Sequence, residues 1–516
     1  MGDRGKGGEV RQLSAPDAAM LALDTSKTYG HIGMLAIFDP LGTDGASYAV
    51  TRQTVAERLH AMPPLRTRLQ PVPLELDRPY WVDDEHFDLD YHIRHHAVPP
   101  PGTPEQLAEV VSRIVARTLD RTRPLWELYV IEGVNGGRHI AHLTKIHHAY
   151  LDGVAGAVML GALLDTDPDT RPTGEVPSWT PRPTPSGMDL LGRAVWTMAA
   201  NPQRLVRAVG RLGKELTDSS TRFVVANRYV QYVPGGVGDR LRRKLRSDTA
   251  RPSALPTTVA PRVHWNGSVS AHRHLAFFTV SLERARAIRR ATQTTFNDVV
   301  MALCGGVLRR YLLLHDDLPE APLLAGMAIS LRTGNEEEFY TNRVLTAVAE
   351  LATDEPDPVA RLMRIRASDT AAKDDFAHLP TGTLQELTAL RPHTFVNLAM
   401  RALVDFRLGQ VVNPPFNVLI SNVPGPAFPL YMAGAQLVHS YPVSIVAEGT
   451  GLNITVQSYC DNLEFGFIVD RELIPDPWVF RELMEEAMVE LEEALGLVAA
   501  PPPKKRAPRK RAAPPR

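Results

Sequence analysis

The sequence predicts a mixed α+β fold in two halves, and three observations support this prediction. Strand-like and helix-like stretches follow one another in both halves, which is typical of sheets covered by helices. A proline-rich stretch over residues 165–187 lies between the halves and indicates a linker. Hydrophobic residues make up 44% of the 516 residues and charged residues 22%, the ordinary composition of a protein with a large buried core.

The N-terminal half, residues 1–164, is expected to form one domain. Alternating apolar side chains predict three strands, at His31–Phe38, Trp126–Glu132 and Ile140–His148. A helix is expected over Pro104–Thr118, because this stretch has helical periodicity and a proline near its start.

The C-terminal half, residues 262–497, shows the same mixture and is expected to form a second domain. Its expected helices are Phe296–Leu314 and Pro477–Leu495. Its expected strands are Leu275–Val280, Leu324–Ser330, Asn417–Ser421, Leu452–Ser458 and Leu463–Val469. Two such halves joined by a long connection indicate a cleft between them, which is a common place for a ligand site.

Residues 165–261 are predicted to be the linker followed by a helical crossover. Beyond Met188, the residues Leu191, Val195 and Met198 recur at helical spacing in an arginine-rich stretch. A basic amphipathic helix of this kind either packs on its own protein or lies on a membrane surface. The sequence leaves both interpretations open.

Charge is balanced over the whole chain, with 57 Lys and Arg residues against 58 Asp and Glu residues. The stretch 501–516 nevertheless holds seven basic residues and no acidic one. We therefore expect residues 498–516 to form a disordered basic tail, which is either solvated or in contact with anionic lipid. The remaining chain is acidic, which argues against nucleic-acid binding.

Several classes of protein are excluded by simple features of the chain. The longest apolar run, Val299–Leu308, is too short for a helix that spans a membrane, which needs about 18 apolar residues. No apolar stretch follows Met1, so we expect no secretory signal and a cytoplasmic location. The two cysteines, Cys304 and Cys460, exclude a disulfide framework, and Cys304 is expected in the core.

The strongest local signal is His147-His148, with Asp152 and Gly153 shortly after it. The unperturbed pKa of histidine, about 6.5, suits proton transfer near neutral pH. Adjacent residues on a strand point to opposite faces, so only one of the two is expected to face a cleft. Asp152 is expected to fix the loop or pair with a cation, and Gly153 to allow close backbone approach. A histidine pair of this kind can also be purely structural.

Further motifs follow in a characteristic order. They are Leu13–Asp17, Pro124-Leu125-Trp126, Lys145–Gly153, Asn297-Asp298, Ser421–Pro426 and Gly451–Tyr459. Together they resemble the bacterial wax ester synthase/diacylglycerol acyltransferase family, whose members are long-chain O-acyltransferases of the CoA-dependent acyltransferase superfamily. The resemblance spans about residues 11–495. The histidine motif alone is shared with chloramphenicol acetyltransferases and peptide-synthetase condensation domains, whereas the ordered set is more specific.

This resemblance implies two chloramphenicol-acetyltransferase-like domains with the active site at their interface. It implies that an acyl group moves from the co-substrate acyl-CoA to diacylglycerol, or to a long-chain alcohol, giving triacylglycerol or wax ester. His148 is then the general base, and His147, Asp152 and Gly153 support it. The implied location is the cytoplasm, with peripheral contact to the inner face of the membrane or to lipid droplets.

The remaining motif residues keep alternative interpretations. Pro124, Leu125 and Trp126 are expected to bind substrate or to be structural. Asn297 and the backbone amides from Asn422 to Gly425 are candidate donors to the reaction oxyanion. Equally, Asn297-Asp298 can cap a helix that begins at Val299, and the turn around Gly425 can simply be rigid.

No cofactor is expected, because His92, His95 and His96 lack a recognised metal-ligand spacing. No Gly-x-Ser-x-Gly motif is present, so no covalent acyl-enzyme is expected. Two alternatives remain to the leading hypothesis. The protein could acylate another lipid alcohol, or it could be a catalytically weak paralogue that binds a lipid or membrane surface.

Overall fold

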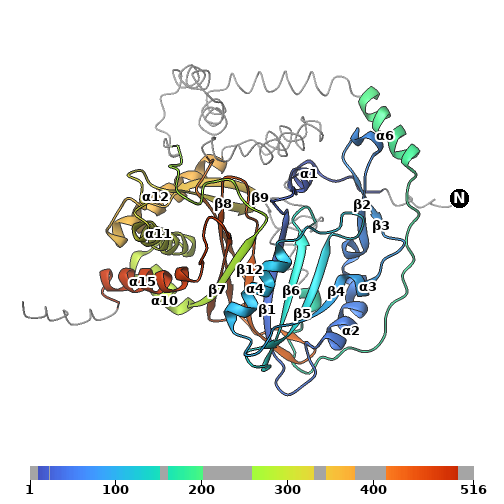
Figure 1. The fold of residues 1–516 in the computed structure, drawn as a ribbon, viewed down its shortest axis with the longest axis horizontal. Coiled ribbons are helices and arrows are strands. Elements are labelled where there is room, and N and C mark those ends of the chain that lie inside the picture. The colour runs from blue at the N-terminus through green and yellow to red at the C-terminus, as the bar shows by residue number, and fades with distance from the viewer. Residues whose placement is uncertain are drawn as a thin grey trace, which may run out of the picture.

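The computed structural model describes residues 10–22, 24–150, 161–200, 259–330, 344–377 and 414–497. These residues form two six-stranded sheets and one small two-stranded sheet, with helices around them (Figure 1). No helix in this part of the chain is both long and apolar enough to cross a membrane.

The elements follow in chain order. The strands are β1 (His31–Asp39), β2 (Thr67–Gln70), β3 (Tyr80–Asp83), β4 (Ile93–Ala97), β5 (Trp126–Val134), β6 (His139–His147), β7 (Arg273–Ser281), β8 (Leu324–Ser330), β9 (Val344–Glu350), β10 (Val418–Val423), β11 (Tyr431–Met432), β12 (Ala435–Val443), β13 (Leu452–Tyr459) and β14 (Asn462–Asp470). The α-helices are α1 (Ala15–Leu21), α2 (Tyr48–Arg58), α3 (Leu89–His92), α4 (Pro104–Val115), α6 (Gly187–Ala200), α10 (Leu282–Thr292), α11 (Phe296–Leu314), α12 (Pro358–Ala377) and α15 (Val479–Ala494). The 3-10 helices are η1 (Leu59–Ala61), η2 (Pro63–Arg66) and η3 (Pro73–Glu75).

The first sheet combines strands from both halves of the sequence. Its order is β11-β12-β1-β6-β5-β4, and only β4 and β5 run parallel. In the register, Met34 of β1 lies between Thr144 of β6 and Pro442 of β12. The C-terminal half therefore completes the sheet that carries the histidine motif.

The second sheet has the order β7-β14-β13-β10-β8-β9 and belongs to the C-terminal half. Its strand β10 runs parallel to both neighbours, β8 and β13. Helices α10, α11, α12 and α15 pack on this sheet in the largest hydrophobic core (Figure 1). Cys304 of α11 is buried there, as predicted, and burial raises the pKa of its thiol to about 12.

A third core joins the two sheets. Leu35 of β1, Phe277 of β7 and Tyr441 of β12 are all buried in it, together with apolar residues of α4. The N–H of Leu275 in β7 donates a hydrogen bond to the Ser112 hydroxyl of α4 (3.0 Å). Helix α4 therefore lies at the junction of the two halves (Figure 1).

Every strand and helix predicted above is present, but some boundaries were wrong. Helix α4 ends at Val115, not at Thr118, and α15 begins at Val479, not at Pro477. Strand β6 ends at His147, so His148 is the first residue of the turn. These differences are one to three residues, which is typical at element ends.

Strand β12 was not predicted, although it is central to the first sheet. It contains Pro442, and proline normally argues against an internal strand because it cannot donate a ladder hydrogen bond. Its outer neighbour β11 pairs only as far as Ala435 and Gln436. At Pro442 the strand therefore has an open edge, where the missing N–H is tolerated.

The predicted linker has no helix of its own between residues 165 and 186. It is nevertheless attached to the first half. Asp165 forms an isolated β-bridge with Tyr431, and Arg182 forms an ion pair with Asp83 (2.7 Å). The predictions for residues 201–258 and for the tail 498–516 lie outside the described residues.

Candidate active site

The two histidines lie where β6 ends. The N–H of His147 donates to the carbonyl of Leu125 (3.0 Å), just before β5. The N–H of His148 donates to the carbonyl of Gly30 (2.8 Å), just before β1. The backbone of both histidines is therefore held from the two adjacent strands.

The His147 ring is buried and fully engaged. Its Nδ1 accepts a hydrogen bond from the N–H of Ala149 (3.1 Å), so the ring proton is assigned to Nε2. That Nε2 lies 3.2 Å from Oδ2 of Asp24. Because both ring nitrogens have partners within the protein, His147 braces the turn that carries His148.

Asp24 is the partner that sequence reasoning missed. Its carboxylate accepts a hydrogen bond from the Gly30 N–H (2.5 Å) and lies 3.3 Å from an Arg121 nitrogen. Burial by itself raises the pKa of the Asp24 carboxyl, but His147, Gly30 and Arg121 outweigh it, and the net pKa lies below the ordinary value. No local motif marks Asp24, since its partners are distant in sequence. The only available signal was that a buried histidine commonly needs a carboxylate.

Gly30 has no room for a side chain. A Cβ there would lie 2.7 Å from His147 Nε2 and 2.9 Å from the carbonyl oxygen of Met20. The absence of a side chain thus lets the His147 ring reach Asp24. Sequence reasoning missed this residue as well.

His148 is half-buried and faces away from His147. The His148–Gly30 hydrogen bond prolongs the pairing of β1 and β6 by one step. The alternation of side chains therefore places His148 on the sheet face of Thr144 and Ile146, opposite to His147.

The Pro124-Leu125-Trp126 motif supports the same turn from below. The Leu125 carbonyl receives the His147 N–H, and the Trp126 indole N–H donates to the carbonyl of Leu65 (2.8 Å). The Trp126 ring also stacks on His92 at a centroid distance of 4.4 Å. All three motif residues are buried, so their described contacts are internal.

A small apolar cavity of about 10 Å³ lies on the His148 face of the sheet. Strands β5 and β6 line it with Trp126, Thr144 and Ile146, and it is closed by Val55, Leu65, Leu128 and Leu163, with Glu127 also at its edge. The cavity shows that this face is apolar directly beside the turn.

The Asn-Asp motif lies at the start of α11. The helix begins at Phe296, so the expected start at Val299 was wrong. The cap is formed by Thr295 and Asp298, each of which accepts the backbone N–H of the other (3.2 and 2.8 Å). The capping interpretation therefore holds for Asp298 and not for Asn297.

Asn297 ties three elements together. Its amide nitrogen donates to Oδ2 of Asp369 in α12 (3.0 Å), and its oxygen lies 3.5 Å from the amide nitrogen of Asn422 in β10. Asp369 is buried and also pairs with Lys373 (2.8 Å). Burial raises the pKa of the Asp369 carboxyl, although Lys373 and Asn297 favour its charged form. Sequence reasoning missed Asp369, which carries no motif.

Gly425 lies in the turn after β10. Its N–H donates to the hydroxyl of Ser458 (3.1 Å), and a Cβ on it would lie 2.0 Å from the Ser458 carbonyl oxygen. Only glycine fits this approach to β13. The Gly425 amide, one of the expected oxyanion donors, is thus engaged within the protein.

The structure brings Asn297 and Asn422 together, and a buried polar contact connects their sheet with the histidine sheet. The hydroxyl of Ser440 in β12 lies 3.0 Å from Sδ of Met34 and 3.4 Å from Oε1 of Gln457. Met34 pairs with Thr144 in β6, and Gln457 lies beside the turn at Gly425. Asp152 and Gly153 lie outside the described residues.

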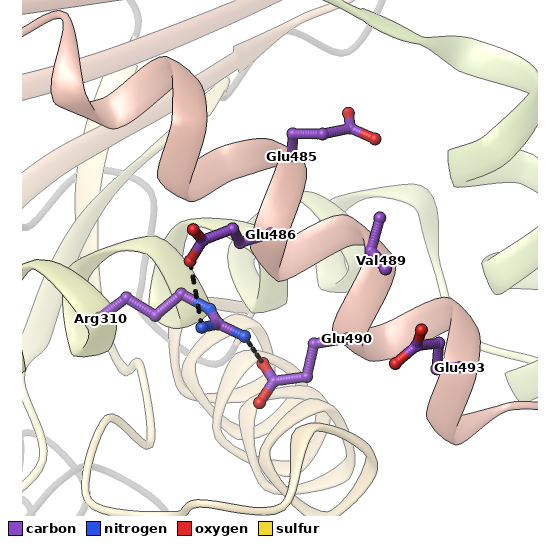
Figure 2. A pocket seen from close by; sticks show the side chains of 6 residues that line it. All are labelled: Arg310, Glu485, Glu486, Val489, Glu490 and Glu493. Carbon is purple, nitrogen blue, oxygen red and sulfur yellow. Dashed lines mark hydrogen bonds and ion pairs between the residues drawn. The ribbon is translucent and has the colours of Figure 1, made fainter. Parts of the chain in front are cut away.

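Two larger depressions contain none of the predicted site residues. One lies along α15, where Arg310 of α11 forms ion pairs with Glu486 and Glu490, both at 3.3 Å (Figure 2). The other lies between α4 and the start of α15, beside His274 and Trp478. Within the described residues, no group of three or more His, Cys, Asp or Glu side chains is arranged to hold a metal ion.

Comparison with known proteins identifies the family. The model of the wax ester synthase/diacylglycerol acyltransferase catalytic domain matches residues 13–300, and that of the WS/DGAT C-terminal domain matches residues 340–492. A protein of Mycobacterium tuberculosis named as a probable diacylglycerol O-acyltransferase is 33% identical over 485 residues. The alignment covers 93% of this chain and 98% of that protein.

Solved structures agree with this assignment. The wax ester synthase/diacylglycerol acyltransferase from Marinobacter aquaeolei VT8 superposes with a TM-score of 0.64 at 29% identity, covering 94% of this chain and 100% of that one. The trichothecene 15-O-acetyltransferase from Fusarium sporotrichioides shares the fold, with a TM-score of 0.54 at 12% identity, covering 94% of each chain. The chain therefore belongs to the wax ester synthase/diacylglycerol acyltransferase family, whose co-substrate is acyl-CoA.

Proposed function

We propose that this protein transfers a long-chain acyl group from acyl-CoA to the hydroxyl of diacylglycerol and releases triacylglycerol and CoA. The observation that carries the proposal is the division between the two histidines. His147 is locked between Asp24 and Ala149, and the turn thereby presents His148 on the opposite, apolar face of the sheet. The names of the mycobacterial relatives favour diacylglycerol as the acceptor.

In this proposal, neutral His148 is the general base. It takes the proton of the acceptor hydroxyl while that oxygen attacks the thioester carbonyl carbon. The tetrahedral intermediate then collapses, the carbon–sulfur bond breaks, and His148 returns the proton to the departing CoA thiolate. General-base catalysis of this kind contributes about 10² to 10⁴ in rate.

The other motif residues receive supporting roles. His147 positions the turn, and Asp152 and Gly153 are assigned to the support of the loop that follows it. We assign Asn297 and Gly425 structural roles, because their amide donors are already bonded to Asp369 and Ser458. Asp298 caps α11, and Asn422 joins Asn297.

We further infer that residues 1–164 and 262–497 form the two acyltransferase-like domains, with the active site at their junction. The third core and the Ser440 contacts support this arrangement. Both substrates carry long apolar chains, so we infer peripheral contact with a lipid surface. The family description also supports wax ester formation, in which a long-chain alcohol replaces diacylglycerol.

The test is the release of free CoA from palmitoyl-CoA, with diacylglycerol or hexadecanol as acceptor. We expect acceptor-dependent release by the native protein and a loss of about 10² to 10⁴ in kcat for His148→Ala. His139→Ala is the matched control, because His139 is a half-buried histidine at the opposite end of the same strand. We expect this control to keep nearly full activity.

Two results would contradict the proposal. Native-like turnover in a folded His148→Ala variant would exclude His148 as the base. The absence of CoA release with both acceptors in the native protein would shift the function to another lipid alcohol, or to lipid binding without catalysis. The ratio of the two acceptor rates separates triacylglycerol synthesis from wax ester synthesis.

A further inference from the structure

Helix α6 packs on the first half of the protein through a narrow apolar face. Leu190 and Ala194 are almost completely buried, and they contact Val72 and Tyr80 in a small core of their own. The spacing of four residues between Leu190 and Ala194 places both on one side of the helix. This face accounts for the attachment of α6 to the protein.

The opposite face of α6 is also apolar, and it is exposed. Met188, Val195 and Trp196 are 75%, 53% and 74% exposed. A Cβ added at Gly192, on the same side, would meet nothing within 4 Å. The spacing 188, 192, 195 and 196 is that of a single helical stripe. The helix therefore presents an apolar stripe that nothing in the described part of the chain covers.

The adjoining 3-10 helix η3 adds two exposed leucines. Leu74 is 82% exposed and Leu76 is 42% exposed. Leu74 also has a φ of +60°, which is costly for a bulky residue without a packing reason. Helix α6 begins directly against η3, since a Cβ on Gly187 would lie 3.4 Å from Cγ of Pro73. We call Leu74, Leu76, Met188, Val195 and Trp196 the α6–η3 patch.

The chemistry of the patch and of the chain beyond it indicates a lipid partner. Large exposed apolar clusters mark interaction sites. Tryptophan with leucine or methionine is the composition of segments that insert at the boundary between headgroups and acyl chains. The sequence that continues from α6, residues 201–258, holds twelve Lys and Arg residues against four Asp and Glu residues. This excess of positive charge complements an anionic lipid surface.

We propose that the α6–η3 patch docks the protein on an anionic lipid surface by insertion of its apolar side chains. The consequence for catalysis rests on the proposed function: a diacylglycerol acceptor is insoluble in water, so a docked enzyme takes it directly from the lipid phase. The patch thus sets access to lipid-borne acceptor and leaves the chemistry at His148 unchanged.

Vesicle flotation of the full-length protein tests the docking. The vesicles contain phosphatidylcholine and phosphatidylglycerol with a small fraction of dioleoylglycerol. We compare Trp196→Ser and the double variant Leu74→Ser/Met188→Ser with the control Leu314→Ser. Leu314 is 63% exposed at the end of α11, so the control removes a similar apolar side chain elsewhere. We expect the partition coefficient to fall at least about tenfold in the patch variants and to stay unchanged in the control.

Binding results decide the proposal independently of catalysis. Native-like flotation of the patch variants, or an equal loss in Leu314→Ser, overturns it. A dimer of the native protein that the patch variants lose, measured by light scattering, assigns the patch to a second copy and overturns it as well. Weak acrylamide quenching of Trp196 fluorescence without lipid, taken as the difference from Trp196→Phe, shows that another segment covers the patch, with the same consequence.

Activity separates this proposal from the proposed function. Patch variants are expected to lose CoA release with diacylglycerol in vesicles and to keep native rates with a water-soluble short-chain alcohol. A native protein that acylates neither acceptor contradicts the proposed function, while patch-dependent flotation still supports the docking surface. Equal activity losses with both acceptors overturn the patch as a site of access.

Discussion

Asp24, Gly30 and Ala149 decide which of the two adjacent histidines is available for chemistry. Asp24 and Ala149 occupy the two ring nitrogens of His147, and Gly30 leaves room for that ring. A general base must reach the substrate with a nitrogen lone pair. His147 has no such lone pair to offer, so the proposed base is the following residue, His148.

Replacement of Asp24 tests this arrangement. In Asp24→Asn the buried His147 loses its anionic partner, and we expect a destabilisation of about 3 kcal/mol. The turn loses its brace, so we expect kcat to fall by about 10-fold to 100-fold with little change in the KM for acyl-CoA. Denaturant unfolding and initial-rate kinetics measure the two effects. A fall in stability without any fall in kcat would limit Asp24 to a structural role.

The same residue predicts a pH dependence of stability. The pKa of Asp24 in the folded protein lies below the unfolded value of about 3.9. Its carboxylate therefore stabilises the fold above that pH, and this stabilisation is lost as the pH falls through the folded pKa. Thermal unfolding between pH 3 and pH 6 should show a weaker pH dependence in Asp24→Asn than in the native protein. Asp44→Asn, at an exposed position, is the charge-matched control.

At the scale of elements, the start of α11 shows how one motif serves two structural tasks. Thr295 and Asp298 satisfy each other's backbone N–H groups, while Asn297 reaches sideways to α12 and β10. The motif therefore fixes both the beginning of the helix and its position against the second sheet.

The cap of α11 gives a prediction with an internal control. Thr295→Ala removes a side chain that accepts the Asp298 N–H, and we expect a loss of about 1 kcal/mol in the free energy of unfolding. Ser47 occupies the equivalent position before α2 but makes no side-chain capping hydrogen bond. Ser47→Ala should therefore leave the urea midpoint almost unchanged. Equal effects of both variants would contradict the capping role of Thr295.

At the scale of the whole molecule, β12 holds the two sheets together. It pairs with β1 in the first sheet and packs on β14 of the second. The approach is so close that a Cβ on Gly466 of β14 would lie 1.8 Å from the carbonyl oxygen of Pro442. A cleft between halves joined in this way is fixed by the packing of the two sheets.

Gly466→Ala should disturb this junction. The added methyl group must push two backbones apart, so we expect a destabilisation of about 1–3 kcal/mol and a lower activity. Gly192→Ala in α6 is the control, because its Cβ enters open space and alanine favours helix. Urea unfolding and CoA release compare the two. A native-like Gly466→Ala protein would show that the sheets can separate at no cost.

The sequence by itself determined what depends on local pattern. Period-two and helical spacings predicted strands and helices such as β8 and α11, and ordered motifs predicted the family and the turn of His148. The same reasoning could not choose between a cap and an oxyanion donor for Asn297, because that depends on Asp369 and Asn422, which are distant in sequence.

Tertiary structure decided the features that need distant partners. Asp24 meets His147 across more than a hundred residues, and β12 enters a sheet built mainly from the other half of the chain. A local window contains neither partner, and Pro442 even disguises β12 as a loop. Buried charges and sheet edges are satisfied only once the chain has folded back on itself, so no spacing along the sequence records them.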